Sequence, residues 1–144
     1  MKTFGALILL VALAACAKGG NRSASASASA SAEANNPASA SDGAVVYQTN
    51  CSSCHQPDGK GLRGAFPPLA GNPLVTGTPT APIAVVKNGL EGRVVVNGVA
   101  YSGIMPRWSG VLSDSQIAAV ITYVRSSWHN RASGVSVAQV QAVK

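Results

Sequence analysis

The chain has 144 residues and a formal net charge of +6, and this length suits one small domain with appended segments but not two domains. Aromatic residues make up only 5% of it, so the domain has few large rings for a core and is expected to need a metal, a disulfide or a large apolar ligand. From residue 42 onward, eight Lys and Arg stand against four Asp and Glu, an excess too small to indicate a nucleic-acid-binding protein.

Residues 1–15 have the pattern of an export signal. A basic start precedes an apolar run from Phe4 to Ala14, which is much shorter than the ~20 residues that a transmembrane helix needs. The ending Leu-Ala-Ala-Cys resembles the lipobox of bacterial lipoproteins, which implies cleavage before Cys16 and lipid attachment to its thiol. An ordinary secretory signal, cut nearby, is the alternative. We therefore expect an exported protein on the periplasmic side of a bacterial membrane, lipid-anchored through Cys16.

The segment 16–41 differs from the rest of the chain in composition. Ser, Ala, Asn and Gly dominate it, and five consecutive Ser-Ala pairs run from Ser23 to Ala32. Such a sequence has no apolar face to bury, so we expect a flexible tether with a typical reach of roughly 25–30 Å. The folded domain is expected over residues 42–129, followed by a tail of polar and small residues at 130–144 to which the sequence assigns no role.

Cys51, Cys54 and His55 form the C-x-x-C-H pattern of covalent c-type haem attachment. Each thiol can add to one vinyl group of the porphyrin, and the neutral Nε2 atom of His55 can bind the iron as the proximal ligand. Two other interpretations stay open at this point: a Cys51–Cys54 disulfide, and the C-x-x-C pair of redox thiols or zinc knuckles. Redox thiols usually follow a strand, and no strand is expected before this pair.

The motif resembles that of the class I c-type cytochromes, and the resemblance extends from residue 42 to about residue 128. It implies an all-α fold of three to four helices around one covalent haem c, with a minor β-hairpin. In that family a small residue and an aromatic residue before the first cysteine contact the last helix. Gly43 and Tyr47 match the first two positions, and Val120 and Tyr123 match their contacts on the last helix.

Two short helices are expected from local signals. The first runs from Gly43 to Asn50, with Asp42 as its N-cap. The second starts at Thr80 as its cap, has a proline in its first turn, and stops at Asn88-Gly89.

A hairpin and a final helix are expected further along the chain. β-branched residues on both sides of Asn97-Gly98 predict a hairpin over Val94–Tyr101, which we expect to cover one edge of the haem. Ser113 and Gln116 form a capping box at the start of the final helix. Its apolar residues then recur at helical spacing: Ile117, Val120, Ile121, Val124 and Trp128.

Residues 66–71 are expected to form an irregular apolar loop beside the haem. A metal-bound histidine normally donates its second ring N–H to an acceptor that fixes the orientation of the ring. The Pro-x-Leu-x-Gly arrangement that begins at Pro67 resembles the family segment that supplies this acceptor. The resemblance implies that the Pro67 carbonyl orients His55 and that Leu69 packs against the haem, with Pro68 as the alternative acceptor.

Met105 is the only methionine downstream of the signal, and it lies in a loop without helical or strand periodicity. Pro106 stiffens the following backbone, and Gly103 permits close approach to a flat surface. The Gly-x-Met-Pro sequence resembles the distal ligand loop of class I cytochromes, which implies that Met105 is the sixth iron ligand. Three alternatives remain: Met105 as core filler, His129 as the ligand, and an open sixth position.

With His55 and Met105 bound to iron, no position is left for a substrate or for oxygen, so we expect a single-electron carrier and not an enzyme. Its redox partners are expected to be membrane-associated or periplasmic proteins, and the small positive charge suits transient docking to an acidic surface. The alternatives are a haem subunit of a larger dehydrogenase, nitrite reductase or terminal oxidase, and a haem catalyst or gas sensor with an open sixth site.

Overall fold

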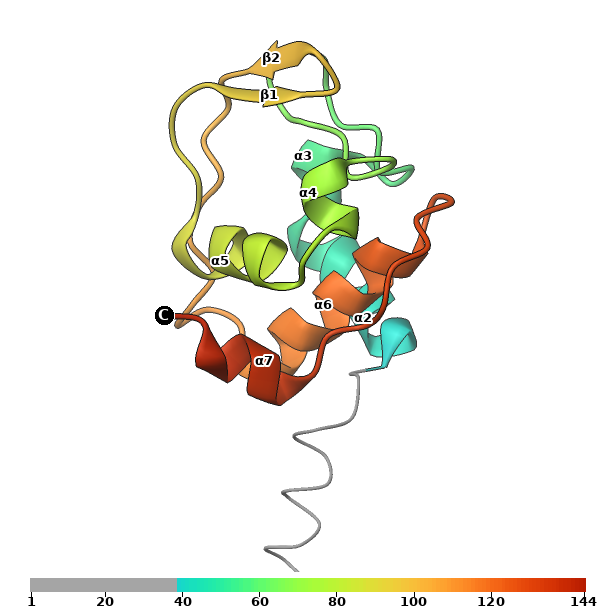
Figure 1. The fold of residues 1–144 in the computed structure, drawn as a ribbon, viewed down its shortest axis with the longest axis vertical. Helices are drawn as coiled ribbons and strands as arrows, with labels where there is room; N and C mark the ends of the chain where they lie inside the picture. The colour runs from blue at the N-terminus through green and yellow to red at the C-terminus, as the bar shows by residue number, and fades with distance from the viewer. Residues whose placement is uncertain (1–38) are drawn as a thin grey trace, which may run out of the picture.

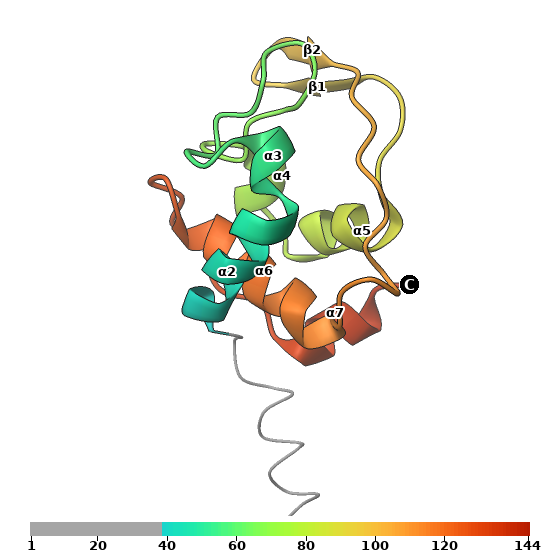
Figure 2. The ribbon, with the colours of Figure 1, turned by 180° about the vertical axis from the view of Figure 1, so that it is seen from behind.

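The structure, a computed structural model, describes residues 39–144 as a mostly helical domain with one small antiparallel sheet (Figure 1). Its elements are α2 (Ala40–Asn50), α3 (Ser52–His55), α4 (Pro73–Thr76), α5 (Thr80–Asn88), β1 (Val94–Val96), β2 (Val99–Tyr101), α6 (Asp114–Ser126) and α7 (Val137–Ala142). The helices gather at one end of the domain and the hairpin lies at the other (Figure 2). This arrangement confirms the expected all-α fold with a minor β-hairpin. No helix among the described residues is both long and apolar enough to cross a bilayer.

Helices α2 and α6 pack together through a glycine. A methyl group at Gly43 would lie 2.0 Å from the carbonyl oxygen of Ala119 and 2.8 Å from the Cβ of Tyr123, so only a hydrogen fits there. Tyr47, one turn later, is fully buried, and its ring centroid lies 5.5 Å from that of Tyr123. The helix begins at Ala40, so Asp42 lies in its first turn and the prediction of Asp42 as N-cap was wrong. An exposed carboxylate there still interacts favourably with the helix dipole.

Helix α6 begins as predicted and ends early. Ser113 Oγ accepts a hydrogen bond from the Gln116 backbone N–H at 3.2 Å, and Gln116 Oε1 accepts one from Ser113 N–H at 2.9 Å, which confirms the capping box. The predicted continuation to Trp128 was wrong, because Trp128 has a φ of 50° and lies beyond the helix. The Ser127 hydroxyl donates to the Tyr123 carbonyl at 2.7 Å, and such a bond competes with the last turn of the helix.

The hairpin and α5 follow their sequence signals. Val94 pairs with Tyr101 in antiparallel register, and Asn97 and Gly98 have φ values of 50° and 78°, as a two-residue type I′ turn requires. Helix α5 ends at Asn88 as predicted, but it begins one residue early, because Pro79 and not Thr80 holds the N-cap position.

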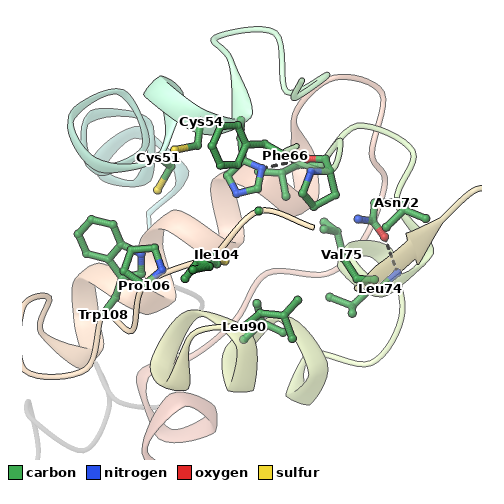
Figure 3. Close-up of a pocket in the computed structure, with 18 of the residues that line it drawn as sticks. Cys51, Cys54, Phe66, Asn72, Leu74, Val75, Leu90, Ile104, Pro106 and Trp108 are labelled. Carbon is green, nitrogen blue, oxygen red and sulfur yellow. Dashed lines mark hydrogen bonds between the residues drawn. The ribbon is translucent and has the colours of Figure 1, made fainter. Parts of the chain in front are cut away.

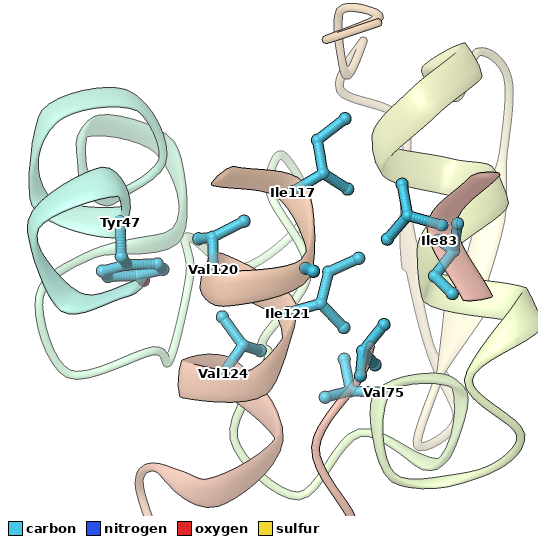
Figure 4. Packing of buried hydrophobic residues seen from close by; sticks show 10 residues of the cluster. Tyr47, Val75, Ile83, Ile117, Val120, Ile121 and Val124 are labelled. Carbon is cyan, nitrogen blue, oxygen red and sulfur yellow. The ribbon is translucent and has the colours of Figure 1, made fainter. Parts of the chain in front are cut away.

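Residues 130–144, to which sequence reasoning assigned no element, pack against the core. Helix α7 starts with a second capping box, and Val135 and Val140 are fully buried. The cluster that they join has α6 at its centre (Figure 4) and includes Tyr47, Val75, Ile83, Ile117, Val120, Ile121 and Val124. A Ser-x-x-Gln pair at residues 136 and 139 is the signal in the sequence that could have revealed this helix.

Arg125 is a buried cation that joins three parts of this core. Its side chain is 2% exposed, and its Nε donates to the Ser133 carbonyl at 2.7 Å. Its Nη1 donates to the carbonyls of Val75 and Gly77, the latter at 3.0 Å. Burial lowers the pKa of Arg125, yet a guanidinium stays charged in proteins, so these carbonyls solvate the charge in place of water.

Replacing Gly43 by alanine is expected to lower the free energy of unfolding of the holoprotein by about 2–4 kcal/mol, because the added methyl group forces α2 away from α6. Intrinsic helix propensity acts in the opposite direction, since alanine is favoured over glycine by about 1 kcal/mol. Denaturant titration measures the loss.

Val45→Ala is the matched control on the same helix, because Val45 is 68% exposed. Its change is expected to stay within about 0.5 kcal/mol. Equal stability of the two variants would contradict the close packing at Gly43.

Candidate functional site

An apolar cavity of ≈ 330 Å³ lies between α3, α4 and the loops that follow the hairpin (Figure 3). Its walls include all four side chains singled out from the sequence as haem attachment points and ligands: Cys51, Cys54, His55 and Met105. Most of the others are apolar: Phe66, Pro67, Leu69, Leu74, Val75, Val85, Leu90, Val94, Val96, Ile104, Pro106 and Trp108. A smaller cavity of ≈ 70 Å³ shares His55, Leu69 and Met105 with it. His129 is exposed and lines neither cavity.

His55 is held in one tautomer. Its Nδ1 lies 3.0 Å from the Pro67 carbonyl oxygen, which can only accept, so Nδ1 carries the hydrogen. Of the two candidate prolines, Pro67 is the acceptor, since the Pro68 carbonyl accepts from Asn72 Nδ2 at 2.8 Å instead. Burial lowers the pKa of His55, and the hydrogen bond to Pro67 opposes that effect. The neutral ring keeps its lone pair on Nε2, which has no hydrogen-bond partner among the described residues.

Three hydrogen bonds from different parts of the chain hold the backbone carbonyls of residues 55–57. The hydroxyl of the buried Tyr47 donates to the Gln56 carbonyl at 2.6 Å, and burial raises the pKa of Tyr47, so the donor stays protonated. The Gly61 N–H donates to the His55 carbonyl at 2.9 Å. The Trp128 indole donates to the Pro57 carbonyl at 3.2 Å, which is the partner that draws this side chain out of the helical pattern.

The Cys51 thiol does not have the environment of a redox thiol. Both thiols are free in the structure, and burial raises the pKa of Cys51 to about 11, with a smaller contribution from Cys54. Redox-active cysteines have lowered pKa values. Within residues 39–144, no three His, Cys, Asp or Glu side chains gather closely enough to hold a free metal ion. The raised pKa of Cys51 therefore argues against the redox-thiol interpretation. Cys16 lies outside the described residues.

The Met105 backbone is held from two sides. It exchanges two hydrogen bonds with Leu90, at 2.9 and 3.0 Å, in an isolated antiparallel bridge. Beyond it, the Trp108 N–H donates to the Val86 carbonyl at 3.0 Å, at the end of α5. Gly89, which the sequence predicted as the stop of α5, ends that helix with a φ of 79°. Sequence reasoning missed its second role: a methyl group there would lie 2.6 Å from the Met105 carbonyl oxygen, so the missing side chain makes room for the Met105 loop.

Gly103 has a different contact from the one expected. It lines the cavity, but a methyl group there would lie 2.4 Å from the Ala65 carbonyl oxygen and 2.9 Å from the Phe66 ring. The glycine is therefore required by the contact between two loops of the protein itself. Its N–H donates to the Ala65 carbonyl at 2.9 Å, which closes this side of the cavity.

The cavity residues fit an iron porphyrin. A neutral imidazole with a free Nε2 and a thioether are both established axial ligands of haem iron, and two thiols on the preceding turn match covalent attachment. The surrounding side chains are almost all apolar, which suits a large apolar ring. Leu69 lies on this wall, and its N–H donates to the Gly59 carbonyl at 2.8 Å.

Comparison with known proteins agrees with this geometry. A family model described as Cytochrome c matches residues 40–128. The cytochrome c subunit of alcohol dehydrogenase (quinone) from Gluconacetobacter polyoxogenes is 44% identical over 94 residues, which are 64% of this chain and 20% of that protein. Cytochrome c-552 from Thermus thermophilus is 40% identical over 91 residues, or 60% of this chain and 68% of that protein.

A third relative is a Cbb3-type cytochrome c oxidase subunit from Cereibacter sphaeroides, 30% identical over 89 residues, which are 60% of this chain and 27% of that protein. The chain thus spans only 20% of the length of the dehydrogenase subunit and 27% of the length of the oxidase subunit. The family model covers more than half of the chain, from residue 40 to residue 128. The chain belongs to the cytochrome c family, as a class I c-type cytochrome with one covalently bound haem c.

Proposed function

We propose that this protein is a single-electron carrier whose haem iron is bound axially by His55 and Met105. The haem supplies a one-electron Fe(III)/Fe(II) couple, and electron transfer is the function of the family. The observation that carries the proposal is that one apolar cavity brings both side chains together, with His55 Nε2 left free by the bond from Nδ1 to Pro67. Cys51 and Cys54 provide the two thioether links.

Each side chain has a defined task in this proposal. The Pro67 carbonyl orients His55 and makes its Nε2 a better donor. The Met105 thioether favours the reduced iron, and the apolar wall that includes Leu69 keeps water away and acts in the same direction. Two protein ligands leave no position for a substrate, so the same site is not expected to perform bond chemistry.

Partner proteins are proposed on the evidence of charge and of the relatives. Two of the relatives are subunits of a dehydrogenase and of an oxidase by name. We infer a partner with an acidic docking surface, because Arg63, Arg93 and Arg107 are exposed on segments next to those that form the cavity. Electrostatic attraction of this kind raises the association rate and still permits rapid release. Membership of a larger dehydrogenase, nitrite reductase or oxidase complex is the second candidate, and the names of the two relatives favour the dehydrogenase and the oxidase.

The proposed location is the periplasmic side of a bacterial membrane. The support is the signal-like segment 1–15 and the Leu-Ala-Ala-Cys ending at Cys16, which lie outside the described residues. A lipid on Cys16 would hold the protein at the membrane surface, and residues 16–41 would give the domain its reach.

Met105→His is expected to lower the midpoint potential by on the order of 0.1 V or more, because imidazole is a stronger donor and favours Fe(III). Met105→Ala is expected to open the iron to carbon monoxide. Potentiometric titration and reduced-state absorption spectra measure the two effects.

His129→Ala is the matched control, because His129 is exposed and lines neither cavity. It is expected to leave both readouts unchanged. If Met105→Ala keeps the wild-type potential and stays closed to carbon monoxide, another residue holds the sixth position and the proposal is wrong.

Cys51→Ala/Cys54→Ala is expected to lose the cooperative thermal transition, since the chain without its haem has too few large apolar side chains to close the cavity. Circular dichroism on heating tests this. The control Ser52→Ala/Ser53→Ala alters the same turn without removing a thiol and should melt cooperatively. A sharp transition in the cysteine variant would show that the haem is not needed for folding.

Cys16→Ser is expected to move the holoprotein from the membrane fraction to the soluble fraction, with its haem spectrum unchanged, because lipidation needs the thiol. Fractionation of cells that express each form measures the distribution. If the serine variant sediments with membranes to the same extent as the wild-type protein, the lipid anchor is ruled out.

A further inference from the structure

The segment 130–144 contacts, at its beginning, the loop that orients His55. Asn130 is only 5% exposed, and its Oδ1 accepts a hydrogen bond from the Gly71 N–H at 2.9 Å. Its Nδ2 donates to the carbonyls of Leu69 at 3.0 Å and of Val124 at 2.8 Å. One buried side chain therefore ties the loop after Pro67 to the end of α6.

The same segment contacts, near its other end, the helix that holds the Met105 loop. The Lys87 ammonium group donates to the Val140 carbonyl at 3.0 Å and to the Val143 carbonyl, at the end of α7. The Lys87 carbonyl accepts from the Ser109 hydroxyl at 2.7 Å and from the Ser109 N–H at 3.2 Å. Lys87 thus joins the C-terminal segment through its side chain and the chain after Met105 through its backbone.

The middle of the segment is fixed to the core. The Thr122 hydroxyl accepts from the Val135 N–H at 2.9 Å and donates to the Val135 carbonyl at 3.3 Å, and Val135 is fully buried. Both ends of the segment 130–144 are therefore connected to a middle part that is fixed to α6. Residues 130–144 lie beyond the segment 40–128 that matches the family model.

We propose that residues 130–144 hold the Met105 loop at a fixed position relative to the His55 loop, and that Lys87 and Asn130 are the positioning residues. This inference rests on the proposed axial ligation by His55 and Met105. A thioether is a neutral ligand that dissociates when its loop moves away. His55 directly follows Cys54, so the covalent attachment keeps His55 close to the iron. Release of either end of the segment then lets Met105 leave the iron before the domain unfolds.

The test is made on the holoprotein with two thermal readouts. The thioether–iron charge-transfer band of the ferric form follows Met105, and far-ultraviolet circular dichroism follows the helices. In Lys87→Leu the band is expected to disappear at a temperature lower than the wild-type value by roughly 5 °C or more, because a hydrogen-bonded charge is lost. The helix transition should fall by less, so the two midpoints separate. Asn130→Ala, at the other end, should separate them as well.

Two controls distinguish positioning from a general loss of stability. Lys60→Leu removes the same charge from an exposed lysine that pairs with Asp58, and should change neither midpoint. Thr122→Val loosens the middle of the segment, and should lower both midpoints together. If Lys87→Leu and Asn130→Ala lower both midpoints in parallel, or lower neither, the positioning role is refuted. If the wild-type protein has no thioether band, the proposed ligation by Met105 fails and this inference fails with it.

Discussion

The hydrogen bond from His55 Nδ1 to the Pro67 carbonyl is the interaction on which the rest of the site depends. It selects one tautomer, leaves Nε2 free for iron, and fixes the plane of the ring against a loop that cannot rotate easily. The surrounding structure serves to hold its two ends. Tyr47 and Gly61 hold the backbone carbonyls of Gln56 and His55, and Asn130 holds the loop that carries Pro67.

Elements with local causes could be predicted from the sequence. The capping box at Ser113 and the Asn97-Gly98 turn each depend on a few adjacent residues, and the structure has both. The end of α6 could not be predicted, because Trp128 is drawn out of the helix by the Pro57 carbonyl, 71 positions away in the chain. Helix α7 has a local signal in its capping box at Ser136 that was not used, but the burial of Val140 depends on the surfaces of other helices and could not be predicted.

The candidate site likewise contains features that could be predicted from the sequence and features that could not. The attachment motif and Met105 could be found because their side-chain chemistry is unusual, and the cavity brings them together. The contacts that Gly89, Lys87 and Asn130 make could not be predicted, because their partners are backbone carbonyls and amides, and a sequence does not reveal where these groups point. Their importance appears only once the loops have a position in space.

The packing of Gly43 against α6 has a consequence for the order of folding. Helix α2 ends at Asn50 and α6 begins at Asp114, so their contact closes a loop of more than 60 residues. Closing such a loop costs roughly 3–4 kcal/mol of chain entropy before the contact contributes anything. The attachment motif directly follows α2, so it is exposed in the chain before this closure. We therefore expect covalent attachment to precede the docking of the two helices, with the ring serving as the surface on which the rest of the chain collapses.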